Sequence, residues 1–128
     1  MYAAGAEHPL REPCRKALER AVASRIALVT DAEVLQELLH RYFAIDKPEV
    51  ARSVYQSTTR LCDEILQVGE THTARALELL MRHRRLSPRD AIHIATMESR
   101  GLRRLLSTDQ DFDGISEVIR IDPARFPS

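Results

Sequence analysis

The chain has 128 residues, of which 44% are hydrophobic and 30% are charged. This length suits one domain with a real core, and the composition excludes a disordered segment. The 19 basic and 19 acidic side chains give a formal net charge of zero, so bulk charge offers no argument for a nucleic-acid partner. The sequence has neither an apolar run long enough for a bilayer nor the features of a signal peptide, so we expect a cytoplasmic protein without a membrane contact.

The first half of the chain predicts a helix, a strand and a second helix. The apolar spacing of Pro9–Ser24 is helical, and the short apolar run Ile26–Val29 suits a strand buried on both faces. Thr30 or Asp31 then caps a helix from Ala32 to about Ala44. We interpret the aromatic pair near the end of this helix, Tyr42-Phe43, as core rather than as a base-stacking platform.

The second half continues the alternation. Pro48 begins a third helix, Glu64–Val68 predicts a strand, and Thr71–Arg85 is helical again. The most informative stretch follows, LSPRDAIHIATMESRGLRRLLSTDQDF, in which Ser87-Pro88 starts a helix and Gly101 suits its C-cap. Because strands alternate with helices, we expect a single α/β domain over residues 1–128, with a parallel sheet between two layers of helices. Four strands are readable: Ile26–Val29, Glu64–Val68, Arg103–Ser107 and Glu117–Ile121.

Cysteines and histidines carry no metal signature. Cys14 and Cys62 lack CxxC spacing, and we interpret both as reduced thiols packed in helices. No two of the five histidines have metal-ligand spacing. His93 follows Asp90 by three residues and shares its helix face, and we expect it to be a packed or hydrogen-bonded structural histidine.

Three acids lie near the expected carboxyl ends of strands, where open α/β sheets bind ligands. Glu37 follows the first strand by two helical turns, Asp90 lies in the first turn of its helix, and Asp109 ends a strand. Each has an ordinary alternative: a helix-surface Glu, a helix-start Asp, and a turn Asp that bonds its own backbone. Asp111 and Asp113 follow as further ligands or turn residues.

A cluster of three carboxylates needs a compensating cation, because like charges otherwise force one acid to take up a proton. Mg²⁺ suits such oxygen ligands together with substrate phosphates. The arrangement therefore predicts metal-assisted phosphodiester hydrolysis, in which the metal generates hydroxide and stabilises charge on the phosphate. Basic residues nearby, among them Arg85 and Arg89, suit a phosphate backbone, with ordinary solvated charge as the alternative.

The order and surroundings of these acids resemble the PIN-domain family, and within it the VapC-type toxin ribonucleases. The matching segments are residues 30–39, 86–96 and 106–112. The resemblance implies a parallel sheet of about five strands between helices, an Mg²⁺- or Mn²⁺-dependent RNA endonuclease, a homodimer, and inhibition by a small cognate antitoxin. Glu37, Asp90 and Asp109 match the family's second, third and fourth metal-site acids, Asp111 matches a frequent extra acid, and Thr108 matches a polar residue beside the metal.

The family's first strand, which carries its first acid in the middle of the sheet, is expected to be missing here. Three explanations stay open: a start codon placed too late, direct pairing of the two flanking strands, or a second chain that fills the gap. We favour the first, because the rest of the motif is intact, and it predicts an in-frame apolar strand with an Asp upstream of Met1. The main hypothesis is thus a metal-dependent endoribonuclease, and the alternative is a catalytically impaired PIN-like module that dimerises or binds an antitoxin.

Overall fold

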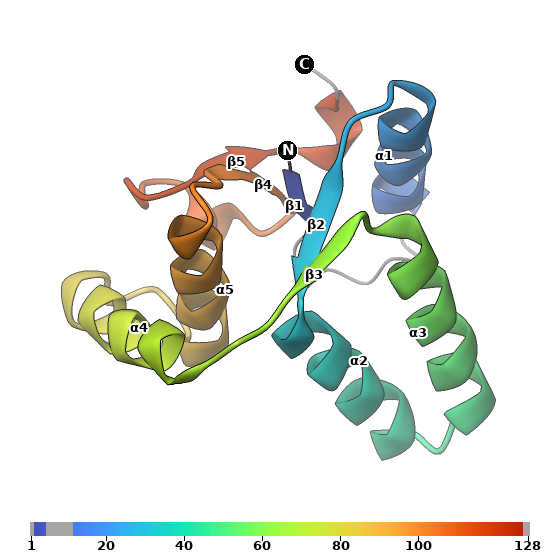
Figure 1. The fold of residues 1–128 in the computed structure, drawn as a ribbon, viewed down its shortest axis with the longest axis horizontal. Helices are drawn as coiled ribbons and strands as arrows, with labels where there is room; N and C mark the ends of the chain where they lie inside the picture. The colour runs from blue at the N-terminus through green and yellow to red at the C-terminus, as the bar shows by residue number, and fades with distance from the viewer. Residues whose placement is uncertain (1, 5–11, 127–128) are drawn as a thin grey trace.

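A parallel five-stranded sheet lies between helices in the computed structural model, which describes residues 2–4 and 12–126, with side chains from residue 16 on (Figure 1). The strand order is β3-β2-β1-β4-β5, so the first strand is central. The α/β class, the helical layers and the parallel sheet are therefore confirmed. The strands are β1 (Tyr2–Ala4), β2 (Leu28–Asp31), β3 (Glu64–Leu66), β4 (Arg104–Leu106) and β5 (Ile119–Ile121).

The central strand corrects one expectation. All four strands predicted from the sequence form, and β1 lies between two of them, with Ala3 opposite Val29 of β2 and opposite Leu105 of β4. Direct pairing of the two flanking strands, one of the three explanations left open, is therefore wrong for this structure, because β1 lies between β2 and β4. The three residues of β1, Tyr2–Ala4, are too short a run to mark a strand in the sequence. β1 pairs with backbone groups that β2 and β4 would otherwise leave without partners. Its three residues include no acid.

Each face of the sheet is covered by helices because neighbouring strand residues point to opposite sides. On one side, Val29 and Leu105 pack with α5 (Pro88–Ser99) and with α4 (Glu70–Arg82). On the other side, Leu28 and Leu106 pack with α1 (Glu12–Ala23) and with Phe126, which follows the short 3-10 helix η2 (Pro123–Arg125). The sheet is thus the middle of three layers.

A helical hairpin projects from the sheet (Figure 1). It consists of α2 (Ala32–Ala44) and α3 (Pro48–Leu61), which meet through Leu38, Tyr42 and Val54. Tyr42 is buried as predicted, but Phe43 is 60% exposed, so its interpretation as core is wrong. The buried stripe of α2 is narrower than its apolar stripe, because only one side of the helix meets α3.

Most predicted boundaries agree with the structure to within a few residues. Asp31 caps α2 and Ser87 caps α5, each accepting a backbone N–H with its side chain. Gly101 adopts φ +70°, the left-handed conformation expected after a helix. Cys62 is a free, buried thiol at the end of α3, and burial raises its pKa to about 11, with Asp63 adding to the effect. Cys14 lies outside the described side chains.

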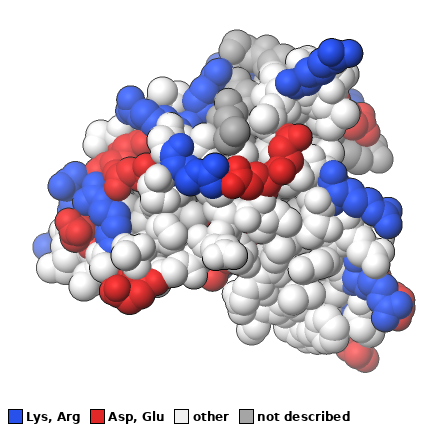
Figure 2. Space-filling view, in the orientation of Figure 1, with Lys and Arg blue, Asp and Glu red and all other residues white. Residues whose placement is uncertain are grey.

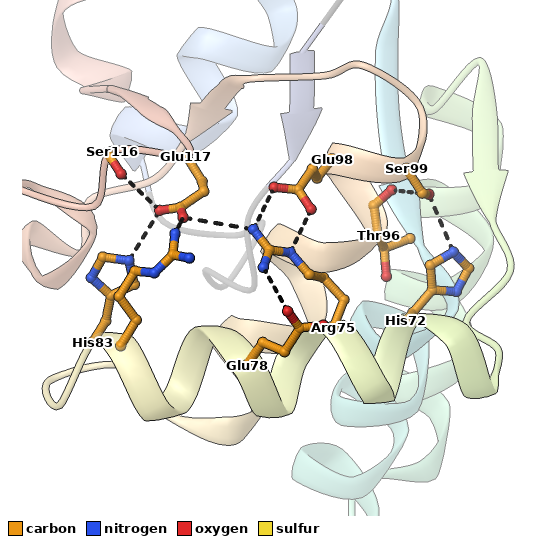
Figure 3. A network of polar contacts seen from close by, with 10 residues as sticks. His72, Arg75, Glu78, His83, Thr96, Glu98, Ser99, Ser116 and Glu117 are labelled. Carbon is orange, nitrogen blue, oxygen red and sulfur yellow. Dashed lines mark hydrogen bonds and ion pairs between the residues drawn. The ribbon is translucent and has the colours of Figure 1, made fainter.

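A polar network ties α4 to α5 and to the loop before β5 (Figure 3). Arg75 of α4 binds Glu98 of α5 through two nitrogens, at 2.7 and 3.1 Å. Glu117, only 10% exposed, binds Arg82 at 2.8 Å and His83 at 3.0 Å. These contacts fix the α4–α5 pair against the sheet. Among the described residues, no helix is long and apolar enough to cross a membrane.

Candidate metal centre

The predicted acids lie at one edge of the sheet. Strands β2 and β4 both run parallel to β1, so their carboxyl ends meet at the same edge. Helix α2, which holds Glu37, begins directly after β2, and Asp109 follows β4 by three residues. Asp90 belongs to the first turn of α5, which packs over the sheet. The topology therefore gathers the three acids.

Glu37 is largely buried and partly paired. Its side chain is 13% exposed, and its Oε1 lies 3.1 Å from Nη1 of Arg89 and 3.7 Å from Nη2 of Arg41. Its other oxygen, Oε2, is buried and has no hydrogen-bond partner among the described residues. A buried carboxylate oxygen without a partner is costly, so this atom is open to a ligand.

Asp90 is held by the start of its own helix. The Ser87 hydroxyl oxygen accepts a hydrogen bond from the backbone N–H of Asp90 at 3.1 Å. Asp90 itself is buried. Burial raises the pKa of the Asp90 carboxyl, and the negative charge of Asp109 raises it further. The Ser87 hydroxyl and the positive groups His93 and Arg89 lower it by a smaller amount, so the net shift is upward. Burial therefore disfavours the charged form of the Asp90 carboxyl by more than its neighbours favour it.

Asp109 begins the short 3-10 helix η1 (Gln110–Phe112) and is half-buried. Its Oδ1 accepts the backbone N–H of Asp111 at 2.9 Å, and its own N–H donates to Oγ of Ser107 at 3.0 Å. The carboxylate therefore caps a turn, which was the ordinary alternative for this residue, and its charge acts on Asp90. Asp111 is exposed on η1 and contributes a backbone N–H to the loop.

The remaining predicted residues lie around this group. Thr108 is half-buried between Ser107 and Asp109, and Arg85 is exposed in the turn before α5. Arg89 is bound to Glu37 rather than free in solvent. Asp113 does not join the acids, because both of its oxygens bind Arg120.

Two residues of the site were not identified as such from the sequence. Asp31 was predicted only as a cap, and the structure adds a bond from its Oδ2 to Nδ1 of His93 at 2.7 Å. His93 is hydrogen-bonded as predicted, but its partner is 62 residues away. The one sequence signal was the position of His93 on the helix face of Asp90.

The carboxylate side chains at this edge are of the chemical type that binds a hard cation. Carboxylate oxygens are the ligands that Mg²⁺ and Mn²⁺ prefer. Among the described residues, Oε2 of Glu37 is free to bind such an ion, and burial disfavours the charged form of Asp90 in the absence of one. Within the part of the chain that the structure describes, however, no three His, Cys, Asp or Glu side chains are placed so that they could hold a metal ion.

Comparison with known proteins gives a consistent picture. The family model for the PIN domain matches residues 1–118. Ribonuclease VapC13 of Mycobacterium tuberculosis is 40% identical over 121 residues, which cover 94% of this chain and 92% of that protein. Ribonuclease VapC7 of the same species is 34% identical over 127 residues, covering 96% and 86%.

Solved structures share the fold at low sequence identity. VapBC2 from Rickettsia felis, bound to a DNA fragment from its promoter, superposes with a TM-score of 0.75 at 16% identity, covering 94% of this chain and 96% of that one. VapC20 from Mycobacterium tuberculosis, a toxin that cleaves the sarcin-ricin loop, gives a TM-score of 0.71 at 20% identity, covering 91% and 95%. These matches support the fold and the order of its elements.

Proposed function

The chain belongs to the PIN-domain family as a VapC-type toxin endoribonuclease, and we propose that it hydrolyses RNA phosphodiester bonds with Glu37, Asp90 and Asp109 as its catalytic acids. The observation that carries this assignment of residues is the buried Oε2 of Glu37, which no described residue hydrogen-bonds, together with the raised pKa of the buried Asp90 carboxyl. A buried carboxylate oxygen without a partner favours a bound cation. A purely structural cluster would leave no such oxygen, just as both oxygens of Asp113 bind Arg120.

Mg²⁺ or Mn²⁺ is the proposed cofactor, held by Glu37, Asp90 and Asp109, with Asp111 close enough along η1 to assist. Such an ion, when bound, lowers the pKa of water and stabilises charge on the phosphate. The side chains of the protein hold and orient the reacting groups. The backbone N–H of Asp111 and the hydroxyl of Ser107 fix the Asp109 loop.

Arginines at the same edge are proposed to bind the RNA backbone. Arg89 and Arg41 both contact Oε1 of Glu37, and their side chains are 47% and 42% exposed. If Glu37 turns toward a cation, both guanidinium groups are released at the mouth of the site, where a phosphate can accept two hydrogen bonds from each. Arg85, in the turn before α5, and Thr108, next to Asp109 in the chain, are proposed as further substrate contacts.

Cleavage of a fluorescent single-stranded or looped RNA tests the assignment. We expect hydrolysis by the unaltered chain with Mg²⁺ or Mn²⁺ and a loss of at least about a hundredfold for Asp90→Asn. Asp46→Asn, which removes an exposed acid at the tip of the α2–α3 hairpin, is the matched control and should leave the rate unchanged. Equal rates for the unaltered chain and Asp90→Asn would remove Asp90 from the mechanism.

A catalytically impaired binding module remains the second candidate. The favouring observations are that no three described side chains are placed to hold a metal and that β1 brings no acid. Titration calorimetry with Mn²⁺ separates the candidates. Saturable binding that Glu37→Gln weakens would count against the module, whereas no binding at all would favour it.

Partner binding is proposed for the apolar surface that the helices expose. Phe43 and Ile45, at the end of α2, are 60% and 56% exposed, and Leu77 and Met81 of α4 are 62% and 80% exposed. In Figure 2 the area over α2 is largely free of charge, whereas acids and bases alternate over α4. We propose that these surfaces bind a protein antitoxin and a second copy of the chain in the cytoplasm. Light scattering should show a dimer, which Met81→Asp or Phe43→Asp would weaken.

A further inference from the structure

A buried hydrogen bond joins the two helices that carry Glu37 and Asp90. Asp31 ends β2 and is 5% exposed, and both of its oxygens are used. Oδ1 accepts the backbone N–H of Val34 at 3.0 Å, which caps α2, and Oδ2 accepts from Nδ1 of His93 at 2.7 Å. One carboxylate therefore holds the start of α2 against the side of α5.

His93 lies close to the acids but does not pair with them. Its ring is 3% exposed, and its Nε2 is buried without a hydrogen-bond partner among the described residues. Because Nδ1 donates to Asp31, the ring presents Nε2 to the interior next to the site. Burial lowers the pKa of His93, but the hydrogen bond and charge of Asp31, and then the charges of Asp90 and Glu37, raise it by more. Both acids thus act on the same buried ring.

The bond fixes short stretches of chain on either side. Glu37 follows Asp31 by six residues within α2, and His93 follows Asp90 by three residues, about one turn of α5. Helices α2 and α5 otherwise touch at few points. A shift of one helix along the other would change the separation of Glu37 and Asp90, and the Asp31–His93 bond opposes that shift.

We propose that Asp31 and His93 form a positioning pair that sets the separation of Glu37 and Asp90 for cation binding. The proposal rests on the metal-dependent function above, and it adds two residues to that site that do not touch the ion. Removal of residues that orient metal ligands without touching the ion typically weakens metal affinity by about 10- to 100-fold. A histidine that served the core alone would affect stability and leave cation affinity unchanged.

Asp31→Ser separates these roles. Serine caps a helix about as well as aspartate, so α2 should stay folded, but its single oxygen leaves Nδ1 of His93 without an acceptor. Two substitutions at the other end form a matched set. His93→Asn keeps an N–H donor near the position of Nδ1, whereas His93→Leu removes it.

The experiment is Mn²⁺ titration calorimetry, with RNA cleavage rates and melting curves for the same proteins. We expect Asp31→Ser and His93→Leu to weaken Mn²⁺ binding by at least about tenfold and to lower kcat with little change in the KM for RNA. His93→Asn should restore most of the affinity. Thr96→Val removes another buried side-chain bond of α5, to the Ile92 carbonyl, and should lower stability without changing Mn²⁺ affinity.

Each other outcome overturns the proposal in a distinguishable way. If the unaltered chain shows no saturable Mn²⁺ binding, the metal-dependent function fails and the positioning pair with it. If the unaltered chain binds Mn²⁺ and folded Asp31→Ser binds it equally well, only the positioning pair fails. The positioning pair also fails, and the metal-dependent function stands, if Thr96→Val weakens Mn²⁺ binding as much as Asp31→Ser does.

Discussion

Arg120 is predicted to hold the loop that carries Asp109. Its side chain extends from β5 and is 15% exposed. Nη1 donates to the Ser107 carbonyl at 3.1 Å, while Nε and Nη2 donate to the two oxygens of Asp113 at 2.8 and 3.2 Å. Arg120 thus binds the loop on both sides of Asp109, at Ser107 and at Asp113.

Replacing Arg120 by Gln should cost about 2 kcal/mol of stability. Ser107 is 1% exposed, and loss of a donor to a buried carbonyl costs about 1–3 kcal/mol. The side chain of Asp113 is 56% exposed, so solvent screens its ion pair with Arg120 and the pair adds little to this cost. For a domain of this size, about 2 kcal/mol corresponds to a fall of about 5–10 °C in Tm.

Melting curves and RNA cleavage rates together form the assay. We expect Arg120→Gln to lower Tm by that amount and the rate by about tenfold, because Asp109 loses its fixed position. Arg120→Lys keeps the charge but lacks the planar guanidinium group. Its Tm and cleavage rate should lie between those of the unaltered chain and of Arg120→Gln. Arg103→Gln is the matched control, since Arg103 also donates to a loop carbonyl, that of Ser116, but at an exposed site. Equal effects of Arg120→Gln and Arg103→Gln would refute the reasoning.

Two further predictions follow from the ion pairs. Burial raises the pKa of Glu117, but hydrogen bonds from Ser116 and from its own backbone, together with His83, lower it by more. The Glu117 carboxylate therefore stabilises the fold above its ordinary pKa of 4.5, and this stabilisation is lost as the pH falls through the lowered pKa. Chemical denaturation should show that Glu117→Gln destabilises the chain at neutral pH and not in strong acid. On an Asp90→Asn background, Arg89→Gln should reduce the slope of log K for RNA against log salt by about 0.7, whereas an unchanged slope would exclude a phosphate contact.

Much of the fold follows from local signals in the sequence. The start of α5 depends on Ser87 and its neighbour Pro88, and the start of α3 depends on Pro48, each of which acts within one helical turn. Buried strands such as β2 follow from apolar runs. Features of this kind can be predicted because the residues that cause them lie next to one another.

The features that escaped prediction depend on partners far along the chain. The three residues of β1 form a strand because β2 and β4 lie on either side, about 25 and 100 residues away. The exposure of Phe43 depends on how α3 covers α2, and one helix alone does not define that coverage. At the site, the acids were visible in order, but the bond between Asp31 and His93 was not.

The cap of α2 shows how a local rule and a distant partner can select one residue type. Serine, asparagine and aspartate all cap helices well, so the cap alone leaves the choice among them open. Serine and asparagine each have a single acceptor oxygen, and one atom cannot occupy both positions from which Oδ1 and Oδ2 of Asp31 accept from Val34 and His93. Aspartate has two acceptors and satisfies both donors in the structure. The aspartate at this position therefore reflects the packing of α5 as much as the start of α2.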